Sequence, residues 1–186
     1  MAFLTRLVLL AVAALIAACS DPHPASGAPP GGDFVLRSSD GPLDTRTQRG
    51  KVLLLYFGYT NCPDICPASL GNGAQALNRL SADERARVRL IMVSVDPERD
   101  TPERLREYTA YFHPEMIGLT GTAAEIAAVA KLYGAGYVRQ PPRVDGGYAV
   151  DHSSQTYVID RDGGLAAVLD LGAPVDKVVE TVRKLL

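Results

Sequence analysis

The sequence predicts an α/β protein in which a mixed β-sheet has helices packed on both faces. Residues 52–57 and 88–95 are almost continuously apolar, which is typical of central strands covered on both sides. Helix-start signals follow each run, and the chain closes with two alternating strands and a helix. The 186 residues, 47% of them hydrophobic, suffice for one domain. A net charge of −2 without a basic run argues against a nucleic-acid partner.

The elements of the first half follow from turn and capping signals. Residues 34–36 and a turn at 40–41 predict a short N-terminal hairpin. Residues 68–80 predict a helix after the first buried strand, although two internal glycines weaken it. Ser81 and Glu84 have the spacing of a capping box and predict a short helical turn before the second buried strand.

The second half contains two more helix starts. Residues 101–112 open with a threonine N-cap followed by proline, and residues 122–133 open with another capping box. Residues 116–119 between them predict a short strand. Each helix therefore has a start that is readable from a few neighbouring residues.

The last elements decide the fold class. Residues 155–159 and 165–169 alternate and flank a turn, which predicts a β-hairpin, and residues 174–186 predict an amphipathic helix. This order is expected of a thioredoxin-like fold with an N-terminal hairpin extension and a helix-bearing insertion.

The N-terminus has the character of an export signal. Arg6 is the one charged residue of the first 18, and the apolar run 7–18 is too short for a comfortable bilayer span. The run ends in small residues before Cys19, which resembles a bacterial lipoprotein signal. The resemblance implies a signal peptide over residues 1–18, lipidation of Cys19 and a membrane-anchored periplasmic protein. The alternative is an ordinary cleaved signal.

A tether is predicted between the signal and the domain. Residues 21–32 contain four prolines and three glycines with little apolar bulk, so they cannot bury enough surface to fold. We therefore expect a flexible segment over residues 19–32 and a folded domain over residues 33–186.

The cysteine pair is the strongest chemical signal. Cys62 and Cys66 are four positions apart, which places them one helical turn apart on the same face if this segment is helical. Such a pair can close a disulfide or hold a soft metal ion. The pair follows the strand at 52–57, and ligands of open α/β sheets bind beyond the carboxyl ends of the strands.

Topology predicts which other residues lie near this pair. Asp96 ends the second buried strand, so it belongs to the same rim of the sheet. His152 precedes the strand at 155–159. If that strand runs antiparallel to the first two, its beginning lies on this rim as well.

Three stretches of the chain carry a family resemblance. FGYTNCPDICP at 57–67, VSVDPERDTP at 93–102 and YAVDHS at 148–153 resemble the three motifs of the Sco/SenC copper-binding proteins. The resemblance covers nearly the whole domain. It implies a thioredoxin-like fold that binds copper, as Cu(I) and also as Cu(II), with thiolates as the soft donors that select Cu(I).

The resemblance also implies residue roles and partners. Cys62, Cys66 and His152 would be the copper ligands, with Asp151 or Asp96 orienting the histidine. The protein would mainly be a metallochaperone for the binuclear copper centre of cytochrome c oxidase. Its partners would be the copper-bearing oxidase subunit and an upstream copper donor.

Three other interpretations of the cysteine pair stay open. The first is a structural disulfide. The second is the redox-active pair of a thiol-disulfide oxidoreductase acting on exported cysteine pairs, and the third is part of a peroxiredoxin-like peroxidase. A short loop makes a structural disulfide weakly stabilising. Oxidoreductases usually space their cysteines two residues apart rather than three. Reductase activity on the same client is compatible with copper transfer.

Overall fold

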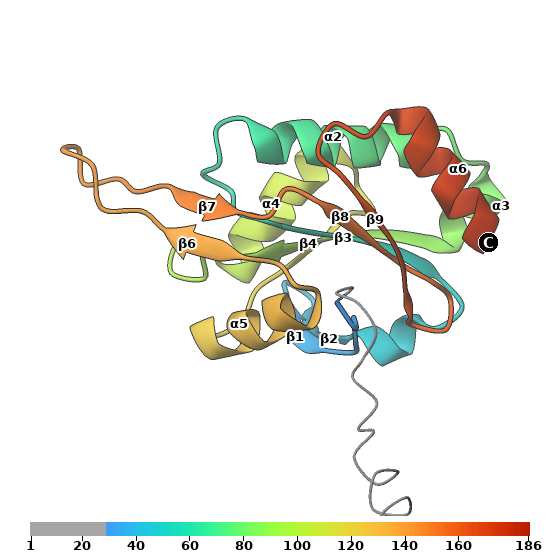
Figure 1. Ribbon diagram of the computed structural model, residues 1–186, viewed down its shortest axis with the longest axis horizontal. Helices are drawn as coiled ribbons and strands as arrows, with labels where there is room; N and C mark the ends of the chain where they lie inside the picture. Colours follow the sequence, from blue (N-terminus) through green and yellow to red (C-terminus); the bar gives the residue numbers. More distant parts are fainter. Residues whose placement is uncertain (1–28) are drawn as a thin grey trace, which may run out of the picture.

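The computed structural model describes residues 29–186, and a mixed five-stranded sheet forms its centre (Figure 1). The strand order is β5-β4-β3-β8-β9. Strands β3, β4 and β5 run parallel, whereas β8 pairs antiparallel with both β3 and β9. The strands are β3 (Val52–Gly58), β4 (Val88–Ser94), β5 (Ile117–Leu119), β8 (Thr156–Ile159) and β9 (Leu165–Leu169).

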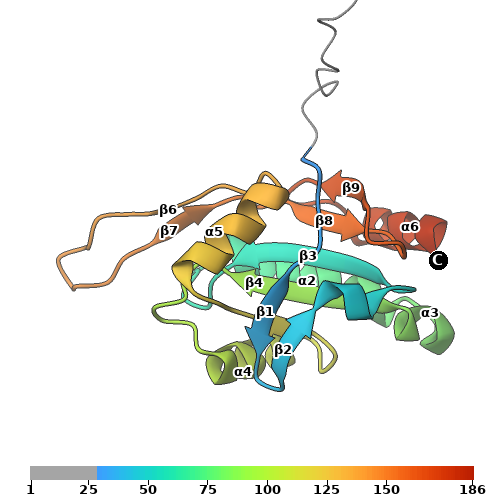
Figure 2. The ribbon, with the colours of Figure 1, turned by 90° about the horizontal axis from the view of Figure 1, so that it is seen from below.

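Helices cover both faces of this sheet, as predicted (Figures 1 and 2). Helices α2 and α6 lie side by side on one face, while α5 and the hairpin β1–β2 lie on the other. Helix α4 packs against the edge strand β5. The remaining bounds are β1 (Val35–Ser38), β2 (Gly41–Asp44), the 3₁₀ helix η1 (Thr45–Gln48), α2 (Ile65–Asn78), α3 (Ala82–Ala86), α4 (Pro102–Phe112), α5 (Ala123–Leu132) and α6 (Val175–Leu185).

The local start signals are confirmed. Ser81 and Thr122 each cap a helix through a complete capping box, and Thr101 accepts a hydrogen bond from the backbone of Arg104 with proline at the helix start. All seven residues of β3 are buried, as its continuous apolar run predicts. The fold class predicted from the sequence is therefore correct.

Helix α2 begins three residues earlier than predicted, at Ile65 instead of residue 68. Pro67 lies inside its first turn, where proline is tolerated because the first backbone N–H groups of a helix have no intrahelical partner. As a consequence Cys66 belongs to the helix and Cys62 to the loop before it.

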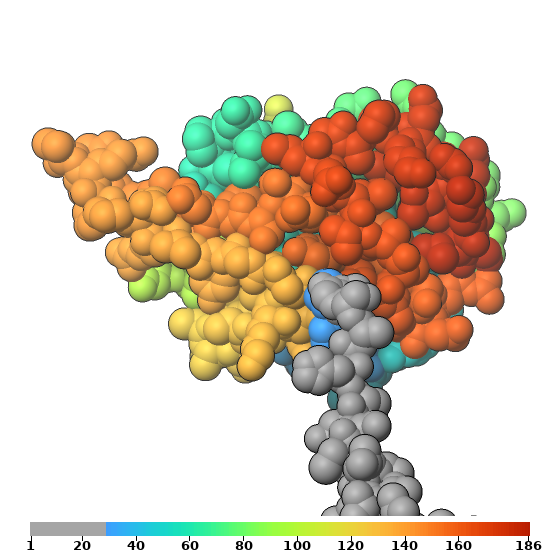
Figure 3. Space-filling view, viewed as in Figure 1, coloured from blue at the N-terminus to red at the C-terminus, as the bar shows by residue number. Residues whose placement is uncertain are grey.

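A separate two-stranded sheet, which the sequence did not predict, carries the histidine. Strands β6 (Tyr137–Arg139) and β7 (Val150–His152) form an antiparallel ribbon in which Tyr137 pairs with His152. The ribbon projects from the body of the domain (Figure 3). Three-residue strands contain too few positions for a period-2 pattern, so the sequence signal for them is weak.

The start of the domain also differs slightly from the prediction. The N–H of Gly31 donates to the carbonyl of Leu132 (2.9 Å), and the hydroxyl of Tyr133 donates to the carbonyl of Gly32 (2.7 Å). The predicted tether 19–32 thus ends before Gly31. The predicted signal peptide at 1–18 and Cys19 lie outside the described residues. Within residues 29–186, none of the helices has the length and apolar character needed to cross a membrane.

Candidate metal centre

The two cysteines meet at the carboxyl end of β3. The backbone N–H of Cys66 donates to Sγ of Cys62, with an N···S distance of 3.4 Å. Both thiols are free, and the residues are 7% and 0% exposed. The loop and the first turn of α2 therefore hold two reduced sulfur atoms close together, with Cys62 on the outer side.

His152 completes a cluster of three donor atoms. Its Nε2 lies 3.3 Å from Sγ of Cys66. The donor atoms of Cys62, Cys66 and His152 all lie within 4.8 Å of one another. Metal–sulfur bonds of about 2.3 Å place three trigonal donors roughly 4 Å apart, so one ion fits between these atoms after small side-chain movements. The structure thus brings together the three residues that the sequence singled out.

The hydrogen bond on the other ring nitrogen defines the tautomer of His152. Its Nδ1 lies 2.9 Å from the carbonyl oxygen of Ser153. A carbonyl can only accept, so Nδ1 carries the proton and Nε2 presents its lone pair to the thiols. This is the orientation in which an imidazole binds a metal through Nε2.

The structure corrects the expected role of the two aspartates. The carboxylate of Asp151 accepts from the side chain of Gln140 (2.5 Å), and that of Asp96 accepts from the hydroxyl of Tyr148 (2.7 Å). Neither carboxylate binds Nδ1 of His152, because β7 turns the imidazole toward the backbone of the next residue. A main-chain carbonyl therefore takes the place that sequence reasoning assigned to an aspartate.

Two buried tyrosines form the wall behind the histidine. The rings of Tyr56 and Tyr59 meet the imidazole of His152 edge-on, at centroid distances of 6.1 and 5.7 Å. The hydroxyl of Tyr59 also accepts a hydrogen bond from the N–H of Val150 (3.3 Å), which ties β7 to the end of β3. Nothing in the sequence spacing of the two tyrosines links them to a residue so far along the chain.

Gly58 makes room for the inner sulfur. A Cβ atom added at this position would lie 2.8 Å from Sγ of Cys66 and 2.9 Å from the ring of Tyr56. Both distances are too short for non-bonded atoms. The glycine is thus part of the site, although it carries no side chain.

Burial controls the charge state of the inner thiol. Removal from water raises the pKa of Cys66, because the thiolate loses its hydration. A helix start acts in the opposite direction, since it favours a thiolate. At this depth desolvation outweighs the helix. A metal that binds here must therefore displace a proton from Cys66.

The second motif of the resemblance organises the loop that precedes Cys62. Asp100 is 1% exposed, and its carboxylate accepts from the N–H and the hydroxyl of Thr60, at 3.0 and 2.6 Å. The same carboxylate accepts from the hydroxyl of Ser94 (2.7 Å). Asp100 consequently joins the end of β4 to the cysteine loop. Sequence reasoning missed this role, because only the motif itself marked the residue.

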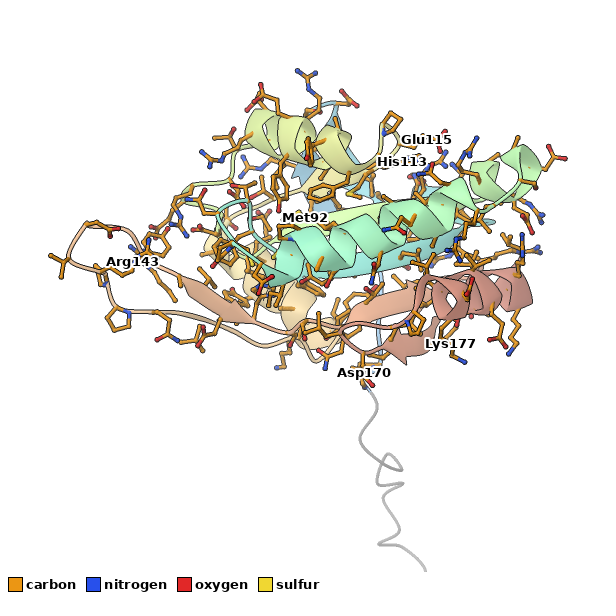
Figure 4. The ribbon with its side chains drawn as sticks, turned by 90° about the horizontal axis from the view of Figure 1, so that it is seen from above. Met92, His113, Glu115, Arg143, Asp170 and Lys177 are labelled. Carbon is orange, nitrogen blue, oxygen red and sulfur yellow. The ribbon has the colours of Figure 1, made fainter. Side chains whose placement is uncertain are left out.

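The cluster is accessible on the side of Cys62. An open pocket of about 370 Å³ borders Cys62 and His152 and is otherwise lined by Tyr59, Pro63, Asp64, Ile65, Ala149, Val150 and Asp151. His113, the other histidine among the described residues, ends α4 beside Glu115, well away from the ribbon tip at Arg143 (Figure 4).

Fold and site together define a thioredoxin-like domain with a cysteine pair and a histidine at one rim of the sheet. The family model described as SCO1/SenC matches residues 22–186. The chain belongs to the SCO1/SenC family, as the three motifs indicated.

Curated relatives agree with this assignment. The bovine protein named "Protein SCO2 homolog, mitochondrial" is 37% identical over 155 residues, which cover 82% of this chain and 58% of the relative. "Protein SCO1, mitochondrial" of Saccharomyces cerevisiae is 39% identical over 160 residues, covering 82% of this chain and 54% of the yeast protein. The chain thus spans little more than half the length of these mitochondrial relatives.

Solved structures share the fold. Copper-bound ScoI of Bradyrhizobium japonicum superposes with a TM-score of 0.77 at 36% identity and covers 84% of this chain and 99% of that chain. Apo Sco1 of Thermus thermophilus superposes with a TM-score of 0.78 at 36% identity, and the match covers 86% of this chain and 93% of that chain. BsSco is described as having a disulfide switch and as a member of the Sco family of cytochrome c oxidase assembly proteins. It superposes with a TM-score of 0.67 at 28% identity, and the match covers 84% of this chain and 93% of that chain.

Proposed function

We propose that this protein is a copper chaperone in which Cys62, Cys66 and His152 bind one copper ion as cargo. The observation that carries the proposal is the convergence of two thiols and an imidazole lone pair within 4.8 Å. Thiolates select Cu(I), and imidazole suits copper in both oxidation states. Similar solved proteins with copper bound support the same cargo.

The site is built for transfer as well as for binding. Two sulfur donors and one nitrogen donor make a three-coordinate centre, and the pocket beside Cys62 and His152 leaves one side of it accessible. A donor group of a client enters from this side and displaces the protein ligands one after another. Cys62, at the outer position, is the first to exchange, while the buried Cys66 leaves last.

The client that we propose is the copper-bearing subunit of cytochrome c oxidase, whose binuclear copper centre would receive the metal. The description of the similar BsSco as an oxidase assembly protein supports this client. An upstream donor would load the site. We further propose that lipid on Cys19 holds the domain at a membrane in the bacterial periplasm, with residues up to about Pro30 as the tether.

A second function on the same site is thiol-disulfide reduction. Both cysteines are free thiols, and their sulfur atoms lie within 4.8 Å of each other, so they must move closer to form a disulfide. The thiolate of Cys62 attacks a client disulfide and releases one client thiol. Cys66 then attacks the mixed disulfide and releases the second. Two electrons pass to the client, and a Cys62–Cys66 disulfide remains. The disulfide switch described for BsSco favours this activity.

Copper titration of the reduced protein tests the proposed function. We expect one Cu(I) per chain, and X-ray absorption should show two sulfur donors and one nitrogen donor. The oxidised protein is the control, because a Cys62–Cys66 disulfide has no thiolate to offer and should not bind copper tightly. Absence of copper binding by the reduced protein, or a site without sulfur donors, would exclude the proposal.

A further inference from the structure

The ribbon that carries His152 is not part of the five-stranded sheet. Strands β6 and β7 pair only with each other within the described residues, and three residues a side make a small ribbon. An isolated two-stranded ribbon is marginally stable in water. The position of the histidine must therefore depend on contacts between the ribbon and the body of the domain.

At its base the ribbon is extended by two hydrogen bonds between its own two ends. The N–H of Ser153 donates to the carbonyl of Gly136 (2.8 Å), and the N–H of Gly136 donates to the hydroxyl of Ser153 (2.9 Å). They hold the main chain on the C-terminal side of His152. On the N-terminal side the hydrogen bond from Val150 to Tyr59 is long, at 3.3 Å.

The N-terminal side has a second attachment, at Tyr148. Its ring lies between two guanidinium groups, with Cζ of Arg99 3.6 Å and Cζ of Arg139 3.8 Å from the ring centroid. Arg99 belongs to the loop after β4, whereas Arg139 belongs to β6. Stacking of a cation on an aromatic face is favourable, more so when it is partly shielded from water. The ring thus joins the ribbon to the loop of the second motif.

Hydrogen bonds strengthen this attachment. The hydroxyl of Tyr148 donates to Asp96 (2.7 Å), and Nη1 of Arg99 donates to the backbone carbonyl of Tyr148 (3.0 Å). Asp96 also accepts from Nε of Arg99 and is 4% exposed. The N–H of Asp96 donates to the hydroxyl of Ser94 at the end of β4 (3.1 Å). The attachment therefore ends on the central sheet.

We propose that Tyr148 is a positioning residue of the copper site. Held between Arg99 and Arg139, it keeps β7 against the domain so that Nε2 of His152 faces the cysteine pair. The proposal rests on the proposed function, in which His152 is a ligand. It gives Asp96 a different task from the one expected from sequence: the carboxylate acts on the histidine through Tyr148.

The test compares variants of the full-length protein by Cu(I) competition with a chelator. Tyr148→Leu removes the ring and the hydroxyl, and we expect copper affinity to fall on the order of tenfold, or about 1.4 kcal/mol. Tyr148→Phe keeps the stacked ring and should retain most of the wild-type copper affinity. Tyr111→Leu is the control, because that tyrosine is 86% exposed and lies on α4; its affinity should equal that of the wild type.

A double-mutant cycle separates positioning from general destabilisation. If Tyr148 acts through His152, then Tyr148→Leu should cause no further loss of affinity in a His152→Ala background. The equilibrium of the Cys62–Cys66 disulfide with glutathione should be unchanged by Tyr148→Leu, since neither cysteine is on the ribbon. In the Cu(II) form, the hyperfine signal of the imidazole nitrogen should weaken in Tyr148→Leu and persist in Tyr148→Phe.

Several results would overturn the proposal. These are an unchanged affinity in Tyr148→Leu, an equal loss in Tyr148→Phe, or the same loss with and without His152. Should Tyr148→Leu not fold, Arg139→Gln removes one of the two stacked cations from a side chain that is 48% exposed, and it should weaken copper binding several-fold. A wild-type copper affinity in Arg139→Gln would also count against the proposal. If the wild type itself binds no copper, it is the proposed function that fails.

Discussion

Gly58 offers a test of the packing around the inner sulfur. In Gly58→Ala the new Cβ would lie 2.8 Å from Sγ of Cys66 and 2.9 Å from Cε1 of Tyr56. Comfortable contacts of this kind are about 3.5–4.0 Å, so the sulfur or the β3 backbone must move by roughly 1 Å. The φ angle of Gly58 is outside the left-handed region, so backbone strain does not complicate the change.

The magnitude follows from the cost of overpacking. An added methyl group in a close-packed interior costs about 1–3 kcal/mol. For a domain of this size, each kcal/mol lowers Tm by about 2–4 °C, which gives a decrease of roughly 2–12 °C. The movement of Cys66 should also weaken Cu(I) binding on the order of tenfold, because the sulfur leaves the place that faces His152.

Gly71→Ala is the matched control. Gly71 lies inside α2, and a Cβ added there meets no atom within 4 Å. Alanine at such a site should stabilise the helix by about 0.4–1 kcal/mol and leave copper binding unchanged. The assay is thermal unfolding of both reduced variants together with chelator competition. A Gly58→Ala protein as stable and as tight in copper binding as Gly71→Ala would refute this account of the site.

Three further predictions concern separate parts of the chain. His152→Ala should lower Cu(I) affinity by more than tenfold yet leave the cysteine disulfide equilibrium with glutathione nearly unchanged; full copper affinity would make the reductase interpretation the leading one. Cys19→Ser should abolish lipid attachment, and a mature wild-type chain that mass spectrometry finds to begin after Cys19, without lipid, would contradict the anchor. Hydrogen bonding with Arg183 lowers the pKa of Glu84 from 4.5 to about 2, so its stabilisation is present above about pH 4.5 and is lost as the pH falls toward 2. Thermal unfolding at pH 7 and pH 3 should therefore show a Tm decrease for Glu84→Gln that shrinks at the lower pH, and an equal decrease at both would exclude this linkage.

Local features were predictable because their causes lie within a few residues. The capping boxes at Ser81 and Thr122 need only two side chains three positions apart, and the structure has both. The buried strand β3 needs only a run of apolar residues. The cysteine pair likewise follows from spacing, although its helix begins at Ile65, three residues before the predicted start.

The histidine was predictable from topology and from resemblance, but its surroundings were not. His152 reaches Cys66 across 86 positions because β8 pairs antiparallel with β3, which returns the chain to the same rim. The ribbon strands are too short to show a pattern. Which group binds Nδ1 depends on how β7 turns, and a backbone carbonyl leaves no trace in the sequence.

The sequence by itself therefore determined the fold class, the helix starts capped by Ser81, Thr101 and Thr122, and the three residues that we propose as donors. Only the tertiary structure decided how those residues are held: the space left by Gly58, the tautomer of His152 and the stacking of Tyr148 between Arg99 and Arg139. It also set the direction of the pKa shift of Cys66, since burial depends on what packs over the helix start rather than on the helix itself. Donor identity is a property of single residues, whereas distance, burial and proton position arise between residues that are far apart in the chain.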